Sequence, residues 1–414
     1  MNGFDSKAEN ATRPGVPIIP LFVLSLLAMS LVAGADVPNK LETNDSTSPT
    51  ARGDWVQEGF DPGHTSFNRF ETELSPENVG NLVELWESPV GGGTLFCGPV
   101  VRDGKVYIGS SGDGQIYAFD AATGATEWVG ESQGILFSAT AAVGHGLVFA
   151  TAFNRPFLAY DAETGEIAWN SGFDGLQAAP TLQGQRLYFF SSDDVLHALD
   201  QETGTEIWSA ETEGSSQSQA AVVLDGRVFQ IRGSGVLGGL TAFDAQTGEI
   251  LWQKIEAGSG SGAVAVRGRL FYRGVVERGG EDVVAALDAA TGELIWETPT
   301  LPGSTSAVPA VAYGMVFVTF VDLFALDAKT GVEVWRVPGV HSVAGPSVAN
   351  GVVYASNLSG EWDAFDARNG ALLWSVVVGG GCGGTCTNAI PVVANGRLYL
   401  AGPDQFLRAY GLPR

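Results

Sequence analysis

The sequence contains few of the residues from which catalytic and metal sites are usually built. Its 414 residues include three cysteines and four histidines. The histidines are scattered and no Cys-x-x-Cys pair occurs, so we expect no transition-metal site. The missing Cys-x-x-Cys-His motif excludes covalent attachment of a c-type haem. A P-loop and the usual nucleophile motifs are missing as well.

Positive charge is also scarce. The chain has 22 lysine and arginine residues against 46 aspartate and glutamate residues, which gives a formal net charge of −24. An acidic surface of this size repels phosphate backbones. The composition therefore argues against nucleic acid as a partner.

Long apolar runs are limited to one, over residues 21–35. It is too short to cross about 30 Å of hydrocarbon comfortably, and it ends in the small-x-small sequence Ala33-Gly34-Ala35. We therefore predict a signal peptide over residues 1–35 and a secreted, periplasmic or cell-envelope protein whose mature chain has no membrane span. Asp5 and Glu9 cancel the positive charge before the run, so an uncleaved anchor is the alternative. Residues 36–53 are polar and lack aromatic residues, which predicts a disordered tether.

What the sequence has in abundance is a repeat. Seven segments contain Asp-x-x-Thr-Gly or Asp-x-x-Asn-Gly with a tryptophan four residues after the glycine: 119–128, 160–169, 199–208, 243–252, 287–296, 326–335 and 365–374. An eighth tryptophan, Trp86, precedes them, and successive tryptophans are 39 to 44 residues apart. Aspartate accepts backbone N–H bonds in tight turns, and glycine adopts the positive φ that such turns need. We expect a tryptophan docking motif that packs the seams between repeats, because eight separated positions cannot converge on one ligand.

Each repeat reads as four short strands joined by tight turns. In the first complete repeat, residues 98–129, we predict strands over 98–102, 105–110, 115–120 and 125–129. Four antiparallel strands per repeat, with no helix between them, predict an all-β, eight-bladed β-propeller over residues 54–414. The last repeat ends after three strands. A strand over residues 82–87, which carries Trp86, is expected to complete that blade and close the ring.

The repeat resembles that of the pyrroloquinoline quinone (PQQ) repeat family, Gly-x-Val/Ile-Tyr-Ala-Leu/Phe-Asp-Ala-x-Thr-Gly-x-x-x-Trp, as in residues 114–128. Residues 59–70 and 74–86 are similar to the segment that leads into the propeller of quinoprotein alcohol and polyvinyl-alcohol dehydrogenases. The resemblance covers about residues 54–414 and implies a quinoprotein alcohol dehydrogenase-like fold. The family includes dehydrogenases that use PQQ and calcium, and the propeller subunit of the outer-membrane β-barrel assembly machinery. The sequence lacks the adjacent Cys-Cys pair and calcium-ligand insertions of the first group, and the lipidation cysteine of the second.

The resemblance implies a ligand funnel formed by the loops that join each outer strand to the next inner strand. These loops and the hairpins of the same face carry the candidate cofactor-binding residues Gln177, Ser218, Arg232, Ser261, Arg273, Ser306, His341 and Asn388. Arginine suits the three carboxylates of PQQ through its paired N–H donors. The alternative is that the polar residues cap strand starts and that the arginines are solvated. His197 lies at a third-strand position that other repeats fill with Tyr117, Leu158, Thr241 or Phe324, so no chemistry is expected there.

The three cysteines lie on either side of the ring closure. Cys382 and Cys386 belong to the loop that enters the last blade, and Cys97 to the loop that enters the first. Export permits a disulfide. We predict a bond between Cys382 and Cys386, with a bond from Cys97 to either of them as the alternative.

Two functions are compatible with these features. We expect a monomeric, non-catalytic binding or scaffold module for a protein or polymer ligand on the funnel face. The alternative is a small quinoprotein dehydrogenase that oxidises an alcohol, sugar or polymer hydroxyl with non-covalently bound PQQ and calcium. The repeats specify the fold and not the loops, so they do not distinguish the two functions.

Overall fold

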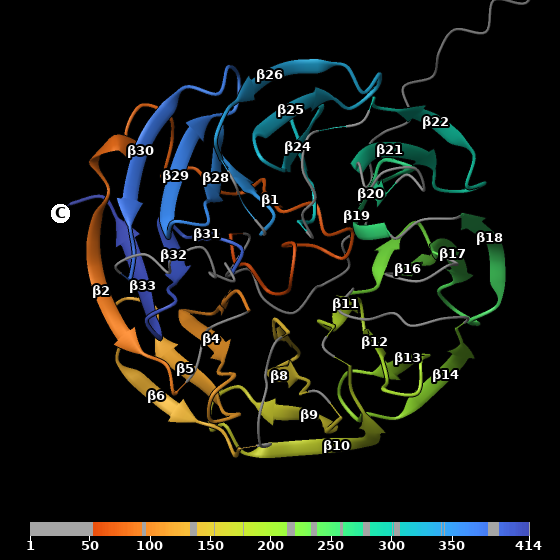
Figure 1. Cartoon of the computed structure of the whole chain (residues 1–414). Helices are drawn as coiled ribbons and strands as arrows, with labels where there is room; N and C mark the ends of the chain where they lie inside the picture. Colours follow the sequence, from red (N-terminus) through yellow and green to blue (C-terminus); the bar gives the residue numbers. More distant parts are fainter. Residues whose placement is uncertain are drawn as a thin grey trace, which may run out of the picture. The chain divides into compact units, whose positions relative to one another are not determined.

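The structure, a computed structural model, describes residues 53–92, 97–132, 139–152, 154–176, 178–212, 220–232, 238–256, 260–275, 282–299, 301, 307–340, 342, 344–379 and 389–413. The predicted signal peptide and nearly all of the predicted tether lie outside these residues. Within the described ranges, no helix is long and apolar enough to span a membrane. The strands form eight sheets around a common axis, seen end-on in Figure 1. The predicted all-β, eight-bladed propeller is therefore confirmed.

Blades 1 to 4 each contain four strands that follow one another in chain order from the axis outward. Blade 1 comprises β3 (Val100–Arg102), β4 (Lys105–Gly109), β5 (Ile116–Asp120) and β6 (Thr126–Val129). Blade 2 comprises β7 (Ala142–Gly144), β8 (Leu147–Ala150), β9 (Pro156–Asp161) and β10 (Ile167–Asp174). Blade 3 comprises β11 (Thr181–Gln183), β12 (Arg186–Phe190), β13 (Val195–Asp200) and β14 (Glu206–Glu211). Blade 4 comprises β15 (Val222–Leu224), β16 (Arg227–Arg232), β17 (Gly238–Asp244) and β18 (Ile250–Glu256).

Blades 5 to 8 continue the ring and use strands from both ends of the chain. Blade 5 comprises β19 (Gly260–Val266), β20 (Arg269–Val275), β21 (Asp282–Asp288) and β22 (Leu294–Glu297). Blade 6 comprises β23 (Ala310–Ala312), β24 (Met315–Thr319), β25 (Leu323–Asp327) and β26 (Glu333–Val337). Blade 7 comprises β27 (Ser347–Ala349), β28 (Val352–Ser356), β29 (Glu361–Asp366) and β30 (Leu372–Val377), with β1 (Phe67–Asn68) parallel to β27. Blade 8 comprises β31 (Val392–Ala394), β32 (Arg397–Ala401), β33 (Phe406–Gly411) and β2 (Val83–Pro89), and the 3-10 helix η1 (Val79–Asn81) precedes β2.

The N-terminal strand β2 completes blade 8, as predicted, by pairing antiparallel with the C-terminal strand β33. The two lie side by side in Figure 1, β2 in orange and β33 in blue. Arg408 of β33 links them: its guanidinium lies 3.0 Å from a Glu87 oxygen of β2 and makes two bonds, of 2.9 and 2.5 Å, to the Asp404 carboxylate. The Arg408 side chain is only 10% exposed. Closure therefore rests on a partly buried charge network as well as on the strand pairing.

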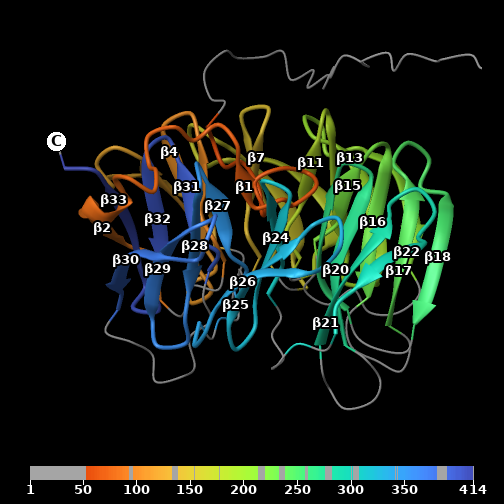
Figure 2. The ribbon, with the colours of Figure 1, turned by 90° about the horizontal axis from the view of Figure 1, so that it is seen from above.

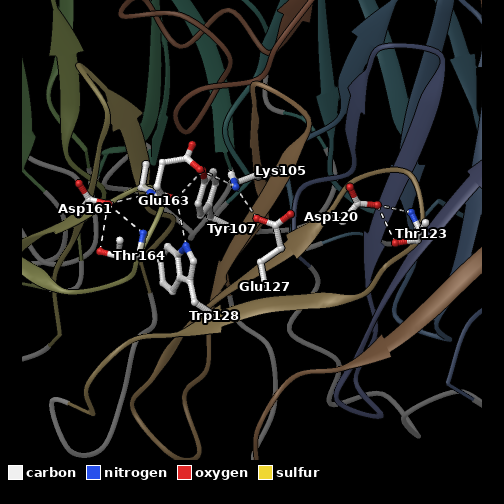
Figure 3. Close-up of polar contacts among 10 residues, drawn as sticks. Lys105, Tyr107, Asp120, Thr123, Glu127, Trp128, Asp161, Glu163 and Thr164 are labelled. Carbon is white, nitrogen blue, oxygen red and sulfur yellow. Dashed lines mark hydrogen bonds and ion pairs between the residues drawn. The ribbon is translucent and has the colours of Figure 1, made fainter.

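The repeated turn and tryptophan lock neighbouring blades together at seven of the eight seams, as Figure 3 shows for blades 1 and 2. In blade 1, Asp120 Oδ1 accepts the backbone N–H and the hydroxyl of Thr123, at 2.8 and 2.6 Å, and Gly124 follows with φ of 73°. The Trp128 indole N–H donates to Ala162 O in the turn of blade 2, at 3.0 Å. The same bond, 3.0 to 3.2 Å long, recurs in the pairs Trp86–Ala121, Trp169–Gln201, Trp208–Ala245, Trp252–Ala289, Trp296–Ala328 and Trp335–Ala367. The predicted packing role of the tryptophans is therefore confirmed at seven seams.

The seam between blades 7 and 8 has a different structure, because the last repeat has no Asp-x-x-Thr-Gly turn. Trp374 instead meets the Tyr410 ring edge to face, with centroids 5.4 Å apart. Apolar residues that precede β2 pack around it: Leu74, Val79 and Leu82. Tyr354 is buried here, and its hydroxyl has no hydrogen-bond partner in the described part of the chain. The equivalent Tyr188 hydroxyl donates to the turn carbonyl of Ala245, at 3.1 Å. The N-terminal segment thus replaces the missing turn with apolar packing.

Candidate functional site

The candidate funnel residues fall mostly outside the part of the chain that the structure describes. This holds for Gln177, Ser218, Ser306, His341 and Asn388, and for the predicted disulfide partners Cys382 and Cys386. Three others lie on described strands, and only their backbone positions are stated: Arg232 ends β16, Ser261 belongs to β19, and Arg273 belongs to β20. The register places Ser261 directly opposite Arg273 in blade 5. A ligand-binding role for these residues stays a prediction.

Cys97, at the start of blade 1, is a buried free thiol that is only 2% exposed. Its Sγ donates to the carbonyl oxygen of Gly109, at 3.2 Å. Burial raises the pKa of the thiol to about 12. A thiol in this environment is not a nucleophile at neutral pH. The pairing of the other two cysteines stays a prediction.

The axial segment, residues 55–68, occupies the other end of the propeller axis. It contacts each inner strand next to the hairpin that leads to the second strand, and Figure 2 shows it with β1 near one end of the propeller. It makes at least one hydrogen bond to every blade in turn, and eight of these bonds are 2.7 to 2.9 Å long: Trp55–Val101, Val56–Val143, Gln57–Leu182, Pro62–Val223, Gly63–Ala265, Thr65–Val311, Ser66–Val348 and Asn68–Val393. All but two of these bonds join backbone to backbone, and backbone groups are the same in every residue, so the sequence does not predict them. The segment ties the eight inner strands together.

Two ionisable side chains of the axial segment have shifted pKa values. Burial raises the pKa of the partly exposed Glu58 carboxyl to about 7. Burial lowers the pKa of His64, which is 3% exposed, to about 4. His64 Nε2 lies 3.0 Å from Thr181 Oγ1, and the Thr181 hydroxyl donates to Ala221 O at 2.6 Å. Since the threonine has given its one proton to the carbonyl, His64 is the neutral tautomer that carries its proton on Nε2.

The two groups act on stability with opposite signs. Glu58 keeps its proton up to about pH 7 in the native state, whereas an unfolded glutamate loses it at about pH 4.5. The contribution of Glu58 to stability is therefore present below pH 4.5 and is lost as the pH rises to 7. Native His64 binds a proton only below about pH 4 and an unfolded histidine below about 6.5, so its contribution is present above pH 6.5 and is lost as the pH falls to 4. Between these limits the two effects oppose each other.

Blade 3 contains a polar cluster that the sequence does not predict. His197 is 4% exposed; its Nε2 lies 2.9 Å from Ser191 Oγ, and its Nδ1 lies 2.9 Å from Glu206 Oε1. The imidazole packs against two rings, Phe173 of blade 2 at 4.2 Å and Phe189 at 5.1 Å between centroids, and the two phenyl centroids lie 6.5 Å apart. The sequence predicted no chemistry at this third-strand position, and that prediction did not anticipate the cluster. The only signal in the sequence is that other repeats place no imidazole there.

The order serine–histidine–carboxylate matches that of hydrolase triads, but the geometry does not support a nucleophile. Ser191 is 2% exposed, and its Oγ lies 2.5 Å from Asp193 Oδ1. A hydroxyl that donates to a carboxylate cannot also donate to the imidazole that would activate it. The cluster therefore orders the β12–β13 hairpin rather than forming an acyl-transfer site.

The outer strands of blades 4 to 8, together with the residue just before β26, expose pairs of large apolar side chains, which we call the apolar rim. Its members are 37 to 64% exposed: Ile250, Leu251, Leu294, Ile295, Val332, Val334, Leu372, Val377, Val83 and Leu85. In Figure 1 these strands follow one another around the ring as β18, β22, β26, β30 and β2. Among the described residues, the outer strands of blades 1 to 3 expose one such side chain each, Val129, Ile167 and Ile207.

A bulge next to the tryptophan shapes every outer strand. Each of the eight outermost pairings shifts register at this point, for example between Ala242–Trp252 and Phe243–Ile250 in blade 4. Bulges at sheet edges interrupt the row of unpaired N–H and C=O groups that another strand would need. The rim is thus suited to contacts through side chains rather than to strand addition.

Comparisons with known proteins agree with this architecture. Residues 112–279, 236–322 and 320–411 match the family model PQQ_2, described as outer membrane protein assembly factor BamB. The quinohemoprotein alcohol dehydrogenase ADH IIB of Pseudomonas putida is 26% identical over 233 residues, which are 54% of this chain and 28% of that protein. The outer membrane protein assembly factor BamB of Bordetella pertussis is 29% identical over 175 residues, 41% of this chain and 44% of that protein. The chain therefore spans less than half of either relative. The crystal structure of BamB from Moraxella catarrhalis has the same fold, with a TM-score of 0.62 at 15% identity, covering 80% of this chain and 97% of that one.

Proposed function

Because this chain belongs to the PQQ_2 family of propellers, described as outer membrane protein assembly factor BamB, we propose that it is a non-catalytic binding module for a protein partner. We propose further that it is exported and works in the cell envelope as a monomer. The observation that carries the proposal is the apolar rim on blades 4 to 8. Exposed apolar side chains of this size are typical of surfaces that bind other proteins. The axial segment and the seven tryptophan locks give the rim a rigid support.

The name of the matching family suggests the probe for the first experiment. A urea-unfolded outer-membrane β-barrel protein is diluted into buffer with the purified chain, and binding is followed by fluorescence anisotropy. Covering one exposed aliphatic pair contributes about 2 kcal/mol, or about 30-fold in Kd. The double substitution Ile250→Lys with Leu251→Lys should therefore weaken binding about 30-fold, and Ile167→Lys on blade 2 should leave it unchanged. Equal binding by all three proteins would contradict a role for the rim.

The second candidate function is that of a small quinoprotein dehydrogenase. The observation in its favour is that Arg273 lies opposite Ser261 in blade 5, among the positions that would face a funnel ligand. Arginine matches the carboxylates of PQQ, and bound PQQ with calcium would supply the oxidising chemistry. Cys97 also lies at this end of the ring, but its thiol is buried and donates to Gly109 O, so it is not exposed to a ligand.

Titration with PQQ and Ca²⁺ separates the two candidates. The protein is mixed with both, the quinone absorbance is recorded, and dye reduction is assayed with a panel of alcohols and sugars. A Kd above about 1 mM, equivalent to roughly 4 kcal/mol, would end the quinoprotein alternative. Tight binding with turnover would overturn the proposal of a non-catalytic module.

A further inference from the structure

The hydrogen bonds of the blade 3 cluster fix the protonation of His197. Ser191 has one hydroxyl proton, and its oxygen lies 2.5 Å from Asp193 Oδ1 and 3.1 Å from Val195 O, both of which accept. His197 Nε2, 2.9 Å from the same oxygen, must therefore donate a proton of its own. Nδ1 faces another acceptor, Glu206 Oε1, at 2.9 Å and needs a proton as well. We infer that His197 is a doubly protonated imidazolium that bridges two carboxylates, one directly and one through Ser191.

The surroundings of the ring favour the cation. Phe173 and Phe189 both pack against it, with ring planes tilted by 31° and 20° from the imidazole plane, and aromatic faces attract cations. The charged groups on the elements packed around it are carboxylates, apart from Arg186 at the far end of β12, which donates to Ala245 O. These carboxylates are Asp161 on β9, Asp174 on β10, Asp193 and Asp194 in the hairpin, Asp200 on β13, and Glu206 and Glu211 on β14. Arg155 directly precedes β9, beside the Asp174 end of β10. Burial raises the pKa of Glu206, and the bonds from His197 and Ser209 lower it, with a net lowering that keeps it ionised.

The cation holds together the seam between blades 2 and 3. The hairpin that carries Ser191 and Asp193 also bonds to blade 2, because Ser192 N–H donates to Asp174 O at 2.8 Å. On its other side, Thr212 N–H donates to Asp194 O at 3.1 Å. When His197 loses one proton, either Ser191 or Glu206 loses its donor. The cluster is thus a proton-operated latch: it holds the hairpin while His197 is charged and releases it when His197 is neutral.

Nuclear magnetic resonance of the chain labelled with ¹⁵N-histidine tests the protonation state. At pH 7.5, where an ordinary histidine with a pKa of about 6.5 is mostly neutral, both His197 nitrogens should resonate as protonated nitrogens. The resonances are assigned by their loss in His197→Gln. One protonated and one unprotonated nitrogen at pH 7.5 would overturn the inference.

Hydrogen exchange of the hairpin amides tests the latch. The protection factors of the Ser192 and Thr212 amides should fall at least tenfold as His197 loses its proton, and Ser191→Ala should remove most of that step. Blade 1 supplies an internal control: its equivalent position is Tyr117, whose hydroxyl donates to Asp113 and whose pKa burial raises to about 12, and its hairpin amide Gly114 donates to Ser110 O. That amide should show no step. Protection in blade 3 that does not change with the charge of His197 would refute the latch.

Discussion

The contact between a turn glycine and a tryptophan ring can be isolated by two substitutions in blade 6. Gly331 and Gly314 have nearly the same backbone conformation, with φ of 72° and 76°. A Cβ added at Gly331 would lie 2.5 Å from Cε3 of Trp296, whereas a Cβ at Gly314 would meet nothing within 4 Å. Alanine in this left-handed region costs about 1–2 kcal/mol at either site. Only Gly331→Ala also forces the indole to move.

The additional cost follows from the distances. Carbon atoms pack at about 3.5–4.0 Å, so the Trp296 ring must withdraw by about 1 Å, and overpacking of this kind costs about 1–3 kcal/mol. The movement also strains the bond of 3.1 Å from the Trp296 indole to Ala328 O, which contributes about 1 kcal/mol. Gly331→Ala should therefore destabilise the protein by about 2–4 kcal/mol more than Gly314→Ala. Urea unfolding followed by far-ultraviolet circular dichroism measures both, and equal losses within about 0.5 kcal/mol would refute the argument.

Three further predictions concern charge and the thiol. Arg408→Met should lower the free energy of unfolding by about 2–4 kcal/mol, because it leaves carboxylates without their cation. Arg368→Met, at a side chain that is 71% exposed, should lower it by less than about 1 kcal/mol. Similar melting temperatures for the two variants would contradict the closure network. Between pH 4.5 and 6.5, the free energy of unfolding should rise with pH in Glu58→Gln, where only His64 still titrates, and should fall with pH in His64→Gln, where only Glu58 does. Unfolding free energies that change with pH in the same direction in both variants would contradict the assigned pKa shifts. Cys97 should react with a thiol reagent only when the chain unfolds, and labelling of the native protein that disappears in Cys97→Ser would show the site to be open.

The sequence predicted the fold because the turn and the tryptophan are local signals that repeat. Trp86 illustrates this: it has no turn before it, yet its spacing alone placed it in the ring, and its indole does donate to Ala121 O. The axial segment gave no such signal. Its bonds to the blades come from groups that every residue carries, such as the carbonyl oxygens of Val56, Pro62 and Gly63. Backbone bonds leave no trace in residue type, so only coordinates reveal them.

The blade 3 cluster was missed for a different reason. Ser191, Asp193 and His197 lie close in sequence, but Glu206 lies on the next strand, beyond the repeated turn, and nothing in the repeat indicates that it meets His197. The chain Asp193–Ser191–His197–Glu206 forms only when β13 pairs with β14 and the hairpin folds back. The candidate funnel residues were chosen from loops, where the repeat gives no register, so their arrangement could not be worked out from the repeat.

One position of the repeat explains where the blades acquire different chemistry. It is the third-strand residue just before the conserved alanine, and from blade 1 to blade 8 it is Tyr117, Leu158, His197, Thr241, Ala285, Phe324, Asp363 and Arg408. The residues around it are committed to packing, since the turn aspartate accepts N–H bonds and the tryptophan docks on the next blade. This position differs from blade to blade, whereas the turn and the tryptophan recur. It holds the imidazole of blade 3, the closing guanidinium of blade 8, and in blade 7 a carboxyl whose pKa burial raises to about 6. Charge enters the core of the propeller here because the turn and the tryptophan that build every blade do not include this position, so each blade can use it for contacts of its own.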